Sequence, residues 1–355
     1  MRGGIGANVA AVQGGSVPVA PSARWGRRAS RMARWAWIAV CLLACLHPRM
    51  GLAADCDSGA ACITQLRFGE TRAQREFAAR MLGERHVEAA LPALADALKK
   101  DDGDFVRALA ARSLGLIGRA DAVPALIDAL RSDKQTPVRA AAATALAQFG
   151  TPDSVAALGA AARGDGEYEV RLAAVAALGE TGSPGGAAAV GGALGSDARR
   201  EVRIKAAEAL VWIKGGSAGD ALKKALAEDK DSAVRARAAQ SMGELADPAQ
   251  TEPLLAALNG DRDSAVRQAA ALSLGKRRDE KAVPALIRAV QRDAALEVRQ
   301  QAAVALGRIG GSAAAEALAY FAEHSVFPQV RRTAAEVIEE YEARLKPVRE
   351  SEGAR

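Results

Sequence analysis

Hydrophobic and small residues recur along this chain with a fixed period of 32 residues. A valine followed by an arginine marks each period, at Val106, Val138, Val170, Val202, Val234, Val266, Val298 and Val330. Four residues after each valine stands an alanine, and four further on a large aliphatic residue. Apolar residues at positions i, i+4 and i+8 form the buried stripe of an amphipathic helix. The pattern therefore predicts one amphipathic helix at the start of every period.

A second apolar segment follows in each period, after a glycine and a short polar turn. Residues 106–118 are an example of the first segment, and residues 122–130 of the second. A proline stands near the start of several second segments, at Pro92, Pro124, Pro253 and Pro284. The missing N–H is tolerated there because first-turn donors have no helical acceptor. Since no stretch shows the alternation of a half-buried strand, we predict an all-α protein of helix–turn–helix units.

Units of this length cannot bury their apolar faces alone and must stack on their neighbours, as in a solenoid. We place eight such units at residues 74–329. A cap segment, residues 55–73, is expected before them. A capping helix over residues 330–347, ended by Pro347, and a disordered tail over residues 348–355 are expected after them.

The residues of one period resemble a known family. The run from Val106 to Gly118, followed by Ala122-Val123-Pro124-Ala125-Leu126, is similar to the short HEAT-type repeat named after the phycobilisome lyases. The resemblance spans the eight units and implies a right-handed α-solenoid of about eight 32-residue helical hairpins. It says little about function, because such repeats serve as scaffolds more often than as enzymes.

Charged residues recur with the same period. The aspartates are Asp101, Asp133, Asp165, Asp197, Asp229, Asp261 and Asp293, and the arginine six residues after each is Arg107, Arg139, Arg171, Arg203, Arg235, Arg267 and Arg299. A guanidinium suits a carboxylate or a free carbonyl, and an aspartate near a helix start can cap exposed N–H groups. One interpretation is a row of anion-binding arginines. We favour a structural ladder that fixes the angle between units, because residues present in every unit serve a feature common to every unit.

The formal charge of +6 is misleading until the chain is divided. Residues 1–54 hold seven arginines and no acidic residue, so 48 − 7 = 41 basic side chains face 42 acidic ones in the remainder. Nucleic acids and anionic lipid surfaces require clustered positive charge. A net charge of about 41 − 42 = −1 therefore argues against a nucleic-acid partner.

Residues 1–54 are interpreted as a leader with a secretory signal. Basic residues precede an apolar run at residues 35–46, and residues 51–54 offer small side chains for cleavage before Asp55. Twelve apolar residues are too few for ~30 Å of hydrocarbon, so no transmembrane span is expected in the mature protein. Met32 opens a conventional signal peptide on its own, which leaves residues 1–31 as leader or as an over-extended gene start. We predict a periplasmic or secreted protein.

A lipid anchor is the alternative to a freely exported protein. Leu42-Leu43-Ala44-Cys45 resembles a bacterial lipobox, in which Cys45 would be lipidated and become the new N-terminus. The residue before Ala44 departs from the preferred small or β-branched type, and the apolar run is short. An outer-membrane lipoprotein therefore remains the second hypothesis.

Cys56 and Cys62 stand six residues apart at the expected mature N-terminus. An oxidising compartment would allow them to form a small disulfide loop that staples the cap segment. A redox-active or metal-binding pair is the alternative. Its spacing would usually be C-x-x-C with a nearby histidine, and neither is present.

Catalytic motifs are absent from the sequence. It contains no G-x-S-x-G, no Walker-type G-x-x-x-x-G-K-[ST] and no H-E-x-x-H. His86 and His324 fall in the first and last units, too far apart to share a site, so no metal or cofactor is predicted. The glycine-rich residues 182–192 are interpreted as a weak second helix of the fourth unit rather than as a phosphate cradle.

The second helices should line the concave face of the solenoid. Their expected outward residues are Asp96, Asp128, Ala160, Gly192, Lys224, Ala256, Arg288 and Tyr320. Variation at equivalent positions is where partner recognition can reside without harming the stack. Candidate partner-binding residues are Lys223, Lys224, Arg288 and Tyr320, with Trp212 as an exposed aromatic anchor at a mostly polar position. The alternative for Trp212 is that it covers the weak fourth unit beside it.

We therefore predict a non-catalytic scaffold or adaptor of the bacterial cell envelope that holds a protein or peptide in its groove. The alternative implied by the resemblance is a lyase, or a helper that handles a tetrapyrrole in the manner of bilin lyase subunits.

Overall fold

The computed structural model describes residues 56–213 and 217–353, and these residues form helices and turns without a strand. The predicted all-α fold is confirmed. The predicted leader, with the candidate lipidation residue Cys45, lies outside the described residues, as does the end of the tail at residues 354–355.

Eight helical hairpins follow one another along the described chain. The first helices are α3 Arg72–Glu84, α5 Asp104–Ile117, α7 Thr136–Leu146, α9 Tyr168–Thr181, α11 Arg200–Ala209, α13 Ser232–Glu244, α15 Ser264–Arg277 and α17 Leu296–Ile309. The second helices are α4 Leu91–Lys100, α6 Val123–Ser132, α8 Pro152–Gly164, α10 Ala187–Ser196, α12 Ser217–Glu228, α14 Thr251–Gly260, α16 Val283–Arg292 and α18 Ser312–His324. Short 3-10 turns precede five of the second helices: η1 Glu88–Ala90, η2 Ala120–Ala122, η3 Pro184–Gly186, η4 Pro248–Gln250 and η5 Glu280–Ala282. Helix α2, Gly59–Phe68, precedes the hairpins, and α19, Pro328–Gly353, follows them.

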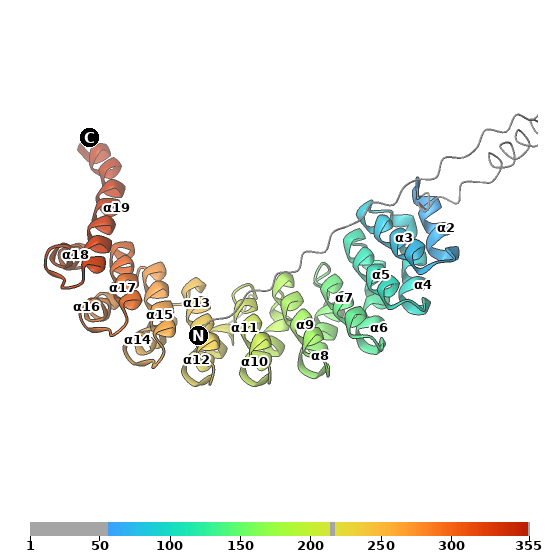
Figure 1. Ribbon diagram of the computed structural model, residues 1–355, viewed down its shortest axis with the longest axis horizontal. Helices are drawn as coiled ribbons and strands as arrows, with labels where there is room; N and C mark the ends of the chain where they lie inside the picture. Colours follow the sequence, from blue (N-terminus) through green and yellow to red (C-terminus); the bar gives the residue numbers. More distant parts are fainter. Residues whose placement is uncertain (1–55, 214–216, 354–355) are drawn as a thin grey trace, which may run out of the picture. The chain divides into compact units, whose positions relative to one another are not determined.

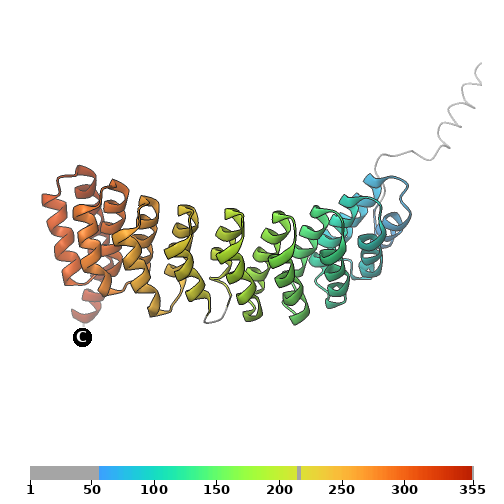
Figure 2. The same ribbon diagram turned by 90° about the horizontal axis from the view of Figure 1, so that it is seen from below.

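The helices form two layers. Each first helix packs against the first helices of the neighbouring hairpins, from α3 to α19, and each second helix lies next to the second helices before and after it. Figure 1 shows the odd-numbered and even-numbered helices as two parallel rows, and Figure 2 shows the stack of hairpins from below. Each layer therefore has one face in the core and one face turned outward.

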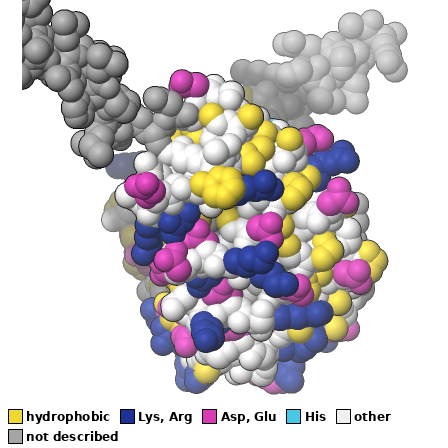
Figure 3. All heavy atoms as spheres, turned by 90° about the vertical axis from the view of Figure 1, so that its right-hand side faces the viewer, with side chains coloured by type: hydrophobic (Ala, Val, Ile, Leu, Met, Phe, Trp, Pro, Cys, Tyr) yellow, Lys and Arg dark blue, Asp and Glu magenta, His cyan; other side chains and the backbone are white. Residues whose placement is uncertain are grey.

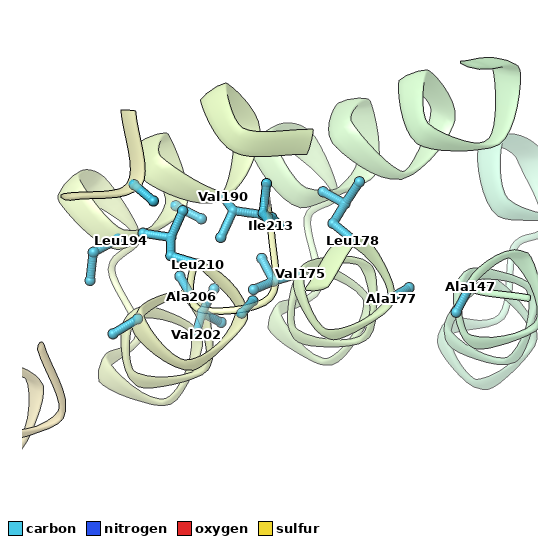
Figure 4. Packing of buried hydrophobic residues seen from close by; sticks show 14 of the residues in the cluster. Ala147, Val175, Ala177, Leu178, Val190, Leu194, Val202, Ala206, Leu210 and Ile213 are labelled. Atoms are coloured by element: carbon cyan, nitrogen blue, oxygen red, sulfur yellow. The ribbon is translucent and has the colours of Figure 1, made fainter. Parts of the chain in front are cut away.

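The periodic residues of the first helices occupy the core between the layers. The eight marker valines and the eight alanines that follow them are fully buried, and so are the large aliphatic residues except Ile338, which is partly buried. Figure 4 shows Val202, Ala206 and Leu210 following one another along α11, with Leu210 beside Val190 and Leu194 of α10. The helical stripe predicted from the sequence is thus the stripe that packs.

Neighbouring first helices approach each other closely at a glycine near their C-terminal ends. A Cβ atom built on Gly115 would lie 2.8 Å from Cβ and 2.9 Å from Cα of Ala145, and Gly179 faces Ala209 in the same way. In six hairpins this position is glycine, and the first helix continues past it. In the other two it is Ala147 or Val211, and α7 and α11 end before reaching it. Because a side chain does not fit there, these two helices unwind into a turn instead.

The glycine-rich stretch folds as the second helix of the fourth hairpin. It forms the 3-10 turn η3 and helix α10, whose outward glycines Gly192 and Gly195 have open space where a Cβ would stand. Helix α9, rather than a strand, precedes it, whereas a phosphate-binding loop of the Walker type follows a strand.

The C-terminal helix is longer than predicted. The sequence places the end of this helix at Pro347 and a disordered tail after it, whereas α19 continues to Gly353. Proline removes one backbone donor and disfavours helix for the residue before it, but it does not forbid helix on both sides. Arg349 and Glu350, which come after Val348, are good helix formers.

Candidate functional site

The periodic arginines from Arg107 to Arg267 each hold two second-helix ends together. Arg203, on α11, donates from Nε and Nη2 to the carboxylate of Asp229 at distances of 2.7 and 3.0 Å. Its Nη1 donates to the backbone oxygen of Asp197 at 2.9 Å. Asp229 ends the second helix of the same hairpin, and Asp197 ends that of the preceding hairpin. One guanidinium therefore ties two consecutive hairpins.

The same bidentate arrangement occurs seven times in the described residues. The pairs are Arg75–Asp101, Arg107–Asp133, Arg139–Asp165, Arg171–Asp197, Arg203–Asp229, Arg235–Asp261 and Arg267–Asp293. In each pair the aspartate comes 26 residues after its arginine, whereas the arginine six residues later binds the aspartate's backbone oxygen. We call this set the ladder. The arginine side chains are only 5–15% exposed, which leaves little of them for a partner.

The ladder has a beginning and an end that the valine marker does not show. It begins at Arg75, which follows Gln74 instead of a valine and was missed by the sequence pattern. It ends at Arg299, because Ser325 occupies the place of the next aspartate. Arg299 instead donates to the backbone oxygen of Asp293 at 2.5 Å and covers the ring of Phe327.

The ladder lowers the pKa of its carboxylic acids. Burial alone would raise the pKa of Asp133, but hydrogen bonds from Arg107 and from the backbone N–H of Gln135, with the charge of Arg107, outweigh it. The pKa is lowered in the same way at six ladder positions: Asp101, Asp133, Asp165, Asp197, Asp261 and Asp293. The carboxylates are therefore ionised more readily in the folded than in the unfolded chain.

We expect the free energy of unfolding to fall in acid. A carboxyl whose folded pKa lies below its unfolded value, about 3.9 for aspartate, stabilises the fold fully above that value. This stabilisation is lost as the pH falls through the lower folded pKa. Urea unfolding at pH 7, 4 and 3 should show stability decreasing mainly below pH 4, with a shallower decrease for Asp133→Asn. Equal stability at pH 4 and pH 3 would contradict this expectation.

The predicted outward positions of the second helices are all exposed. They form one row of side chains. We call this row, together with the exposed residues beside it on the second helices, the second-helix face. Lys223 and Lys224 lie on α12, Arg288 on α16 and Tyr320 on α18, so all four belong to this face. Tyr320 is 56% exposed and stacks on His324 with ring centroids 4.7 Å apart.

Trp212 lies on the opposite layer from the other candidates. It is 71% exposed and borders a hollow of about 450 Å³ between the first helices α9 and α11, with Glu180, Lys205 and Glu208. Lys205 and Arg237 both pair with Glu208. The structure therefore does not bring Trp212 together with the lysines, Arg288 and Tyr320.

The N-terminal cap carries a disulfide between Cys56 and Cys62. Arg85, after α3, donates from Nη1 to the backbone oxygen of Cys56 at 2.6 Å, which fastens the disulfide loop to the first hairpin. The predicted disulfide is confirmed. Helix α2, which carries Cys62, packs against α3 and α4 and so covers the start of the stack.

Within residues 56–213 and 217–353, no group of three or more histidine, cysteine or acidic side chains could hold a metal ion. His86 follows α3 and His324 ends α18, in the first and last hairpins. None of the described helices is long and apolar enough to cross a membrane.

Two layers of stacked helical hairpins define an α-solenoid. The sequence matches the family of HEAT repeats in overlapping segments at residues 61–147, 106–165, 123–211, 155–243, 219–304 and 251–339. The chain belongs to the HEAT-repeat family. No match is found among curated protein sequences.

Several solved structures are similar to this chain. A structure of Kap95p, the yeast importin-beta, is 15% identical, covers 79% of this chain with 43% of its own length, and has a TM-score of 0.57. The CpcE–CpcF complex of phycocyanin lyase from Nostoc is 24% identical over 80% of this chain and 94% of its own, with a TM-score of 0.34. Human deoxyhypusine hydroxylase is 21% identical over 80% and 96%, also with a TM-score of 0.34. At these identities the likeness to Kap95p shows the fold alone.

Proposed function

We propose that the protein is a non-catalytic scaffold that binds a protein or peptide on its second-helix face. The observation that carries the proposal is that the constant and the variable residues of each hairpin lie at different places. The periodic residues are used for stacking and for the ladder, whereas the exposed residues of the second helices differ from one hairpin to the next. HEAT-repeat solenoids are consistent with protein-binding scaffolds, and Kap95p is described as binding RanGDP.

An enzymatic role is the weaker candidate. The two similar structures with enzyme names have TM-scores of 0.34 and carry no argument for activity here. The recurring charged groups that line the hollows of the second-helix face are ladder arginines and aspartates already paired with each other. A visible absorbance band in the purified protein would favour the tetrapyrrole-handling alternative.

We propose further that the protein acts in the bacterial cell envelope. The leader sequence supports export, and the disulfide between Cys56 and Cys62 is of the kind that persists in oxidising compartments. The intact mass of protein recovered from the periplasm distinguishes a chain that starts at Asp55 from one acylated at Cys45. A chain found reduced in the cytosol would contradict this part of the proposal.

Quantitative cross-linking in the periplasmic fraction tests the scaffold function. We expect the wild-type protein to retain a defined partner at fixed stoichiometry, and Trp212→Ala to retain it equally, because Trp212 lies on the other layer. Charge reversal at Lys224 should weaken retention, since exposed charges contribute to recognition and association rate. Loss of the partner in Trp212→Ala, with Lys224→Glu unaffected, would move the binding site to the first-helix layer.

A further inference from the structure

Two hollows of the second-helix face adjoin at helix α14. One lies between α12 and α14 and encloses about 580 Å³, and the other lies between α14 and α16 and encloses about 420 Å³. Gly260 and Asp261 line both hollows, which therefore adjoin each other at the C-terminal end of α14. We call the two hollows together the α14 groove.

The floor of the α14 groove is made of small residues. Ala256 lines it, and a Cβ added to Gly260 would meet no atom within 4 Å. The backbone of α14 is therefore accessible to a polypeptide that crosses it. Glycine is typical of positions where another backbone comes close.

The α16 side of the groove carries uncompensated positive charge. Its carboxylates, Asp261 and Asp293, are each held by a ladder arginine, Arg235 and Arg267. The remaining charged groups are Arg288 and Arg292, both exposed and without an ion pair among the described residues. Two arginines one helical turn apart therefore face a hollow that contains no free acid.

The stack itself does not require these arginines. The equivalent residues are Asp128 and Ser132 in the second hairpin and Gly192 and Ser196 in the fourth. All of them are exposed, and all stand on second helices of the same kind. Arg288 and Arg292 thus give the seventh hairpin a positive charge that the second and fourth hairpins lack, although all three hairpins have the same fold.

The excess positive charge of the groove comes from α16. On the α12 side, Lys223 and Glu252 line the same hollow, so their opposite charges offset each other there. At the opposite end of the stack, near α2 and α4, Figure 3 shows basic and acidic side chains alternating over the surface. An elongated polyanion such as a nucleic acid needs a longer basic track than this groove provides.

We infer that the α14 groove binds an acidic polypeptide segment whose aspartate or glutamate side chains pair with Arg288 and Arg292. Bidentate pairing of guanidinium with carboxylate supplies both attraction and orientation. The small floor admits the main chain of the segment against α14. This inference rests on the scaffold function proposed above and specifies the chemistry of the partner.

The test uses a short fluorescein-labelled peptide of alternating glutamate and alanine, with fluorescence polarisation as the readout. The variant Arg288→Asp with Arg292→Ser gives the seventh hairpin the residues that the second hairpin already carries, so the fold should tolerate it. We expect this variant to weaken binding about tenfold or more. Its melting temperature should equal that of the wild type, and wild-type binding should weaken as salt is raised.

The matched control changes net charge equally on the other layer. Arg112→Asp with Arg80→Ser, on exposed positions of α5 and α3, should leave peptide affinity unchanged. Peptides with glutamine or lysine in place of glutamate should bind at least about tenfold more weakly. Equal affinity for the glutamine peptide, equal affinity of the Arg288/Arg292 variant, or tighter binding of a DNA oligonucleotide would each overturn the inference.

The two proposals can fail separately. If the cellular partner is retained equally by the wild type and by the Arg288/Arg292 variant, the α14 groove is not its site, while the scaffold function stands. If no partner is retained by either protein, the scaffold function itself fails, whatever the peptide does.

Discussion

Arg203→Ala is expected to lower the free energy of unfolding by about 3–5 kcal/mol, the cost of removing one partner from a buried ion pair. The side chains of Arg203 and Asp229 are 6% and 8% exposed. Alanine would leave the Asp229 carboxylate and the backbone oxygen of Asp197 without their donor. Because each hairpin contacts only its neighbours, the loss should be concentrated where α10, α11 and α12 meet. Urea unfolding gives the total, and amide hydrogen exchange locates it.

The ladder contains its own control. Arg299 occupies the equivalent position but pairs with no carboxylate of the described residues, so Arg299→Ala should cost only about 1 kcal/mol, as for an ordinary hydrogen bond. A second variant, Arg203→Met with Asp229→Leu, removes both charges and should recover most of the lost stability. If Arg203→Ala proved as mild as Arg299→Ala, the ladder would not be a structural device.

The fold could be predicted because the residues that recur every 32 positions are apolar or small and all lie on one side of a helix. A valine, an alanine and a leucine at i, i+4 and i+8 define a helical stripe, and the small central residue lets a second helix approach. All three positions proved to be core positions in nearly every hairpin. Exposure of the second helices' outward residues followed from the same helical geometry.

The pairing within the ladder could not be predicted from the period. The aspartate six residues before an arginine and the aspartate 26 residues after it hold the same position in consecutive 32-residue units. Spacing alone therefore does not say which of the two carboxylates the arginine binds. The structure shows that the arginine takes the carboxylate of the later aspartate and the backbone oxygen of the earlier one. Which aspartate supplies the carboxylate depends on how two hairpins pack against each other, and the spacing of residues in the sequence does not specify this packing.

The candidate site was predicted only in part for a related reason. Periodicity identifies which residues of a second helix point outward, but not which of them line a common groove. Lys223 and Arg288 fall on the two sides of the α14 groove, whereas Trp212 lies on the other layer. Arg292 stands in the last turn of α16, four residues after the outward position that the repeat pattern identifies, so the pattern does not mark it.

We expect Gly115→Val to destabilise the protein by about 2–3 kcal/mol, because Gly115 lies where the first helices α5 and α7 approach each other closely. The new Cβ would lie within 3 Å of Cβ and Cα of Ala145, and backbone atoms cannot move aside as a flexible side chain can. The hairpin that carries Val211 at this position avoids the clash by ending α11 at Ala209. The variant should therefore lose helix at the end of α5 as well as stability.

Gly192→Ala is the matched control, and its effect should have the opposite sign. Gly192 lies in the interior of α10 with open space around its would-be Cβ, so alanine should stabilise the helix by about 0.5–1 kcal/mol. The smaller substitution Gly115→Ala should still destabilise, although alanine is intrinsically the better helix former. Urea unfolding and circular dichroism of the three variants decide the matter, because helix propensity alone predicts stabilisation by alanine at both glycines. Only a steric limit on the approach of α5 and α7 makes the two alanine variants differ in sign.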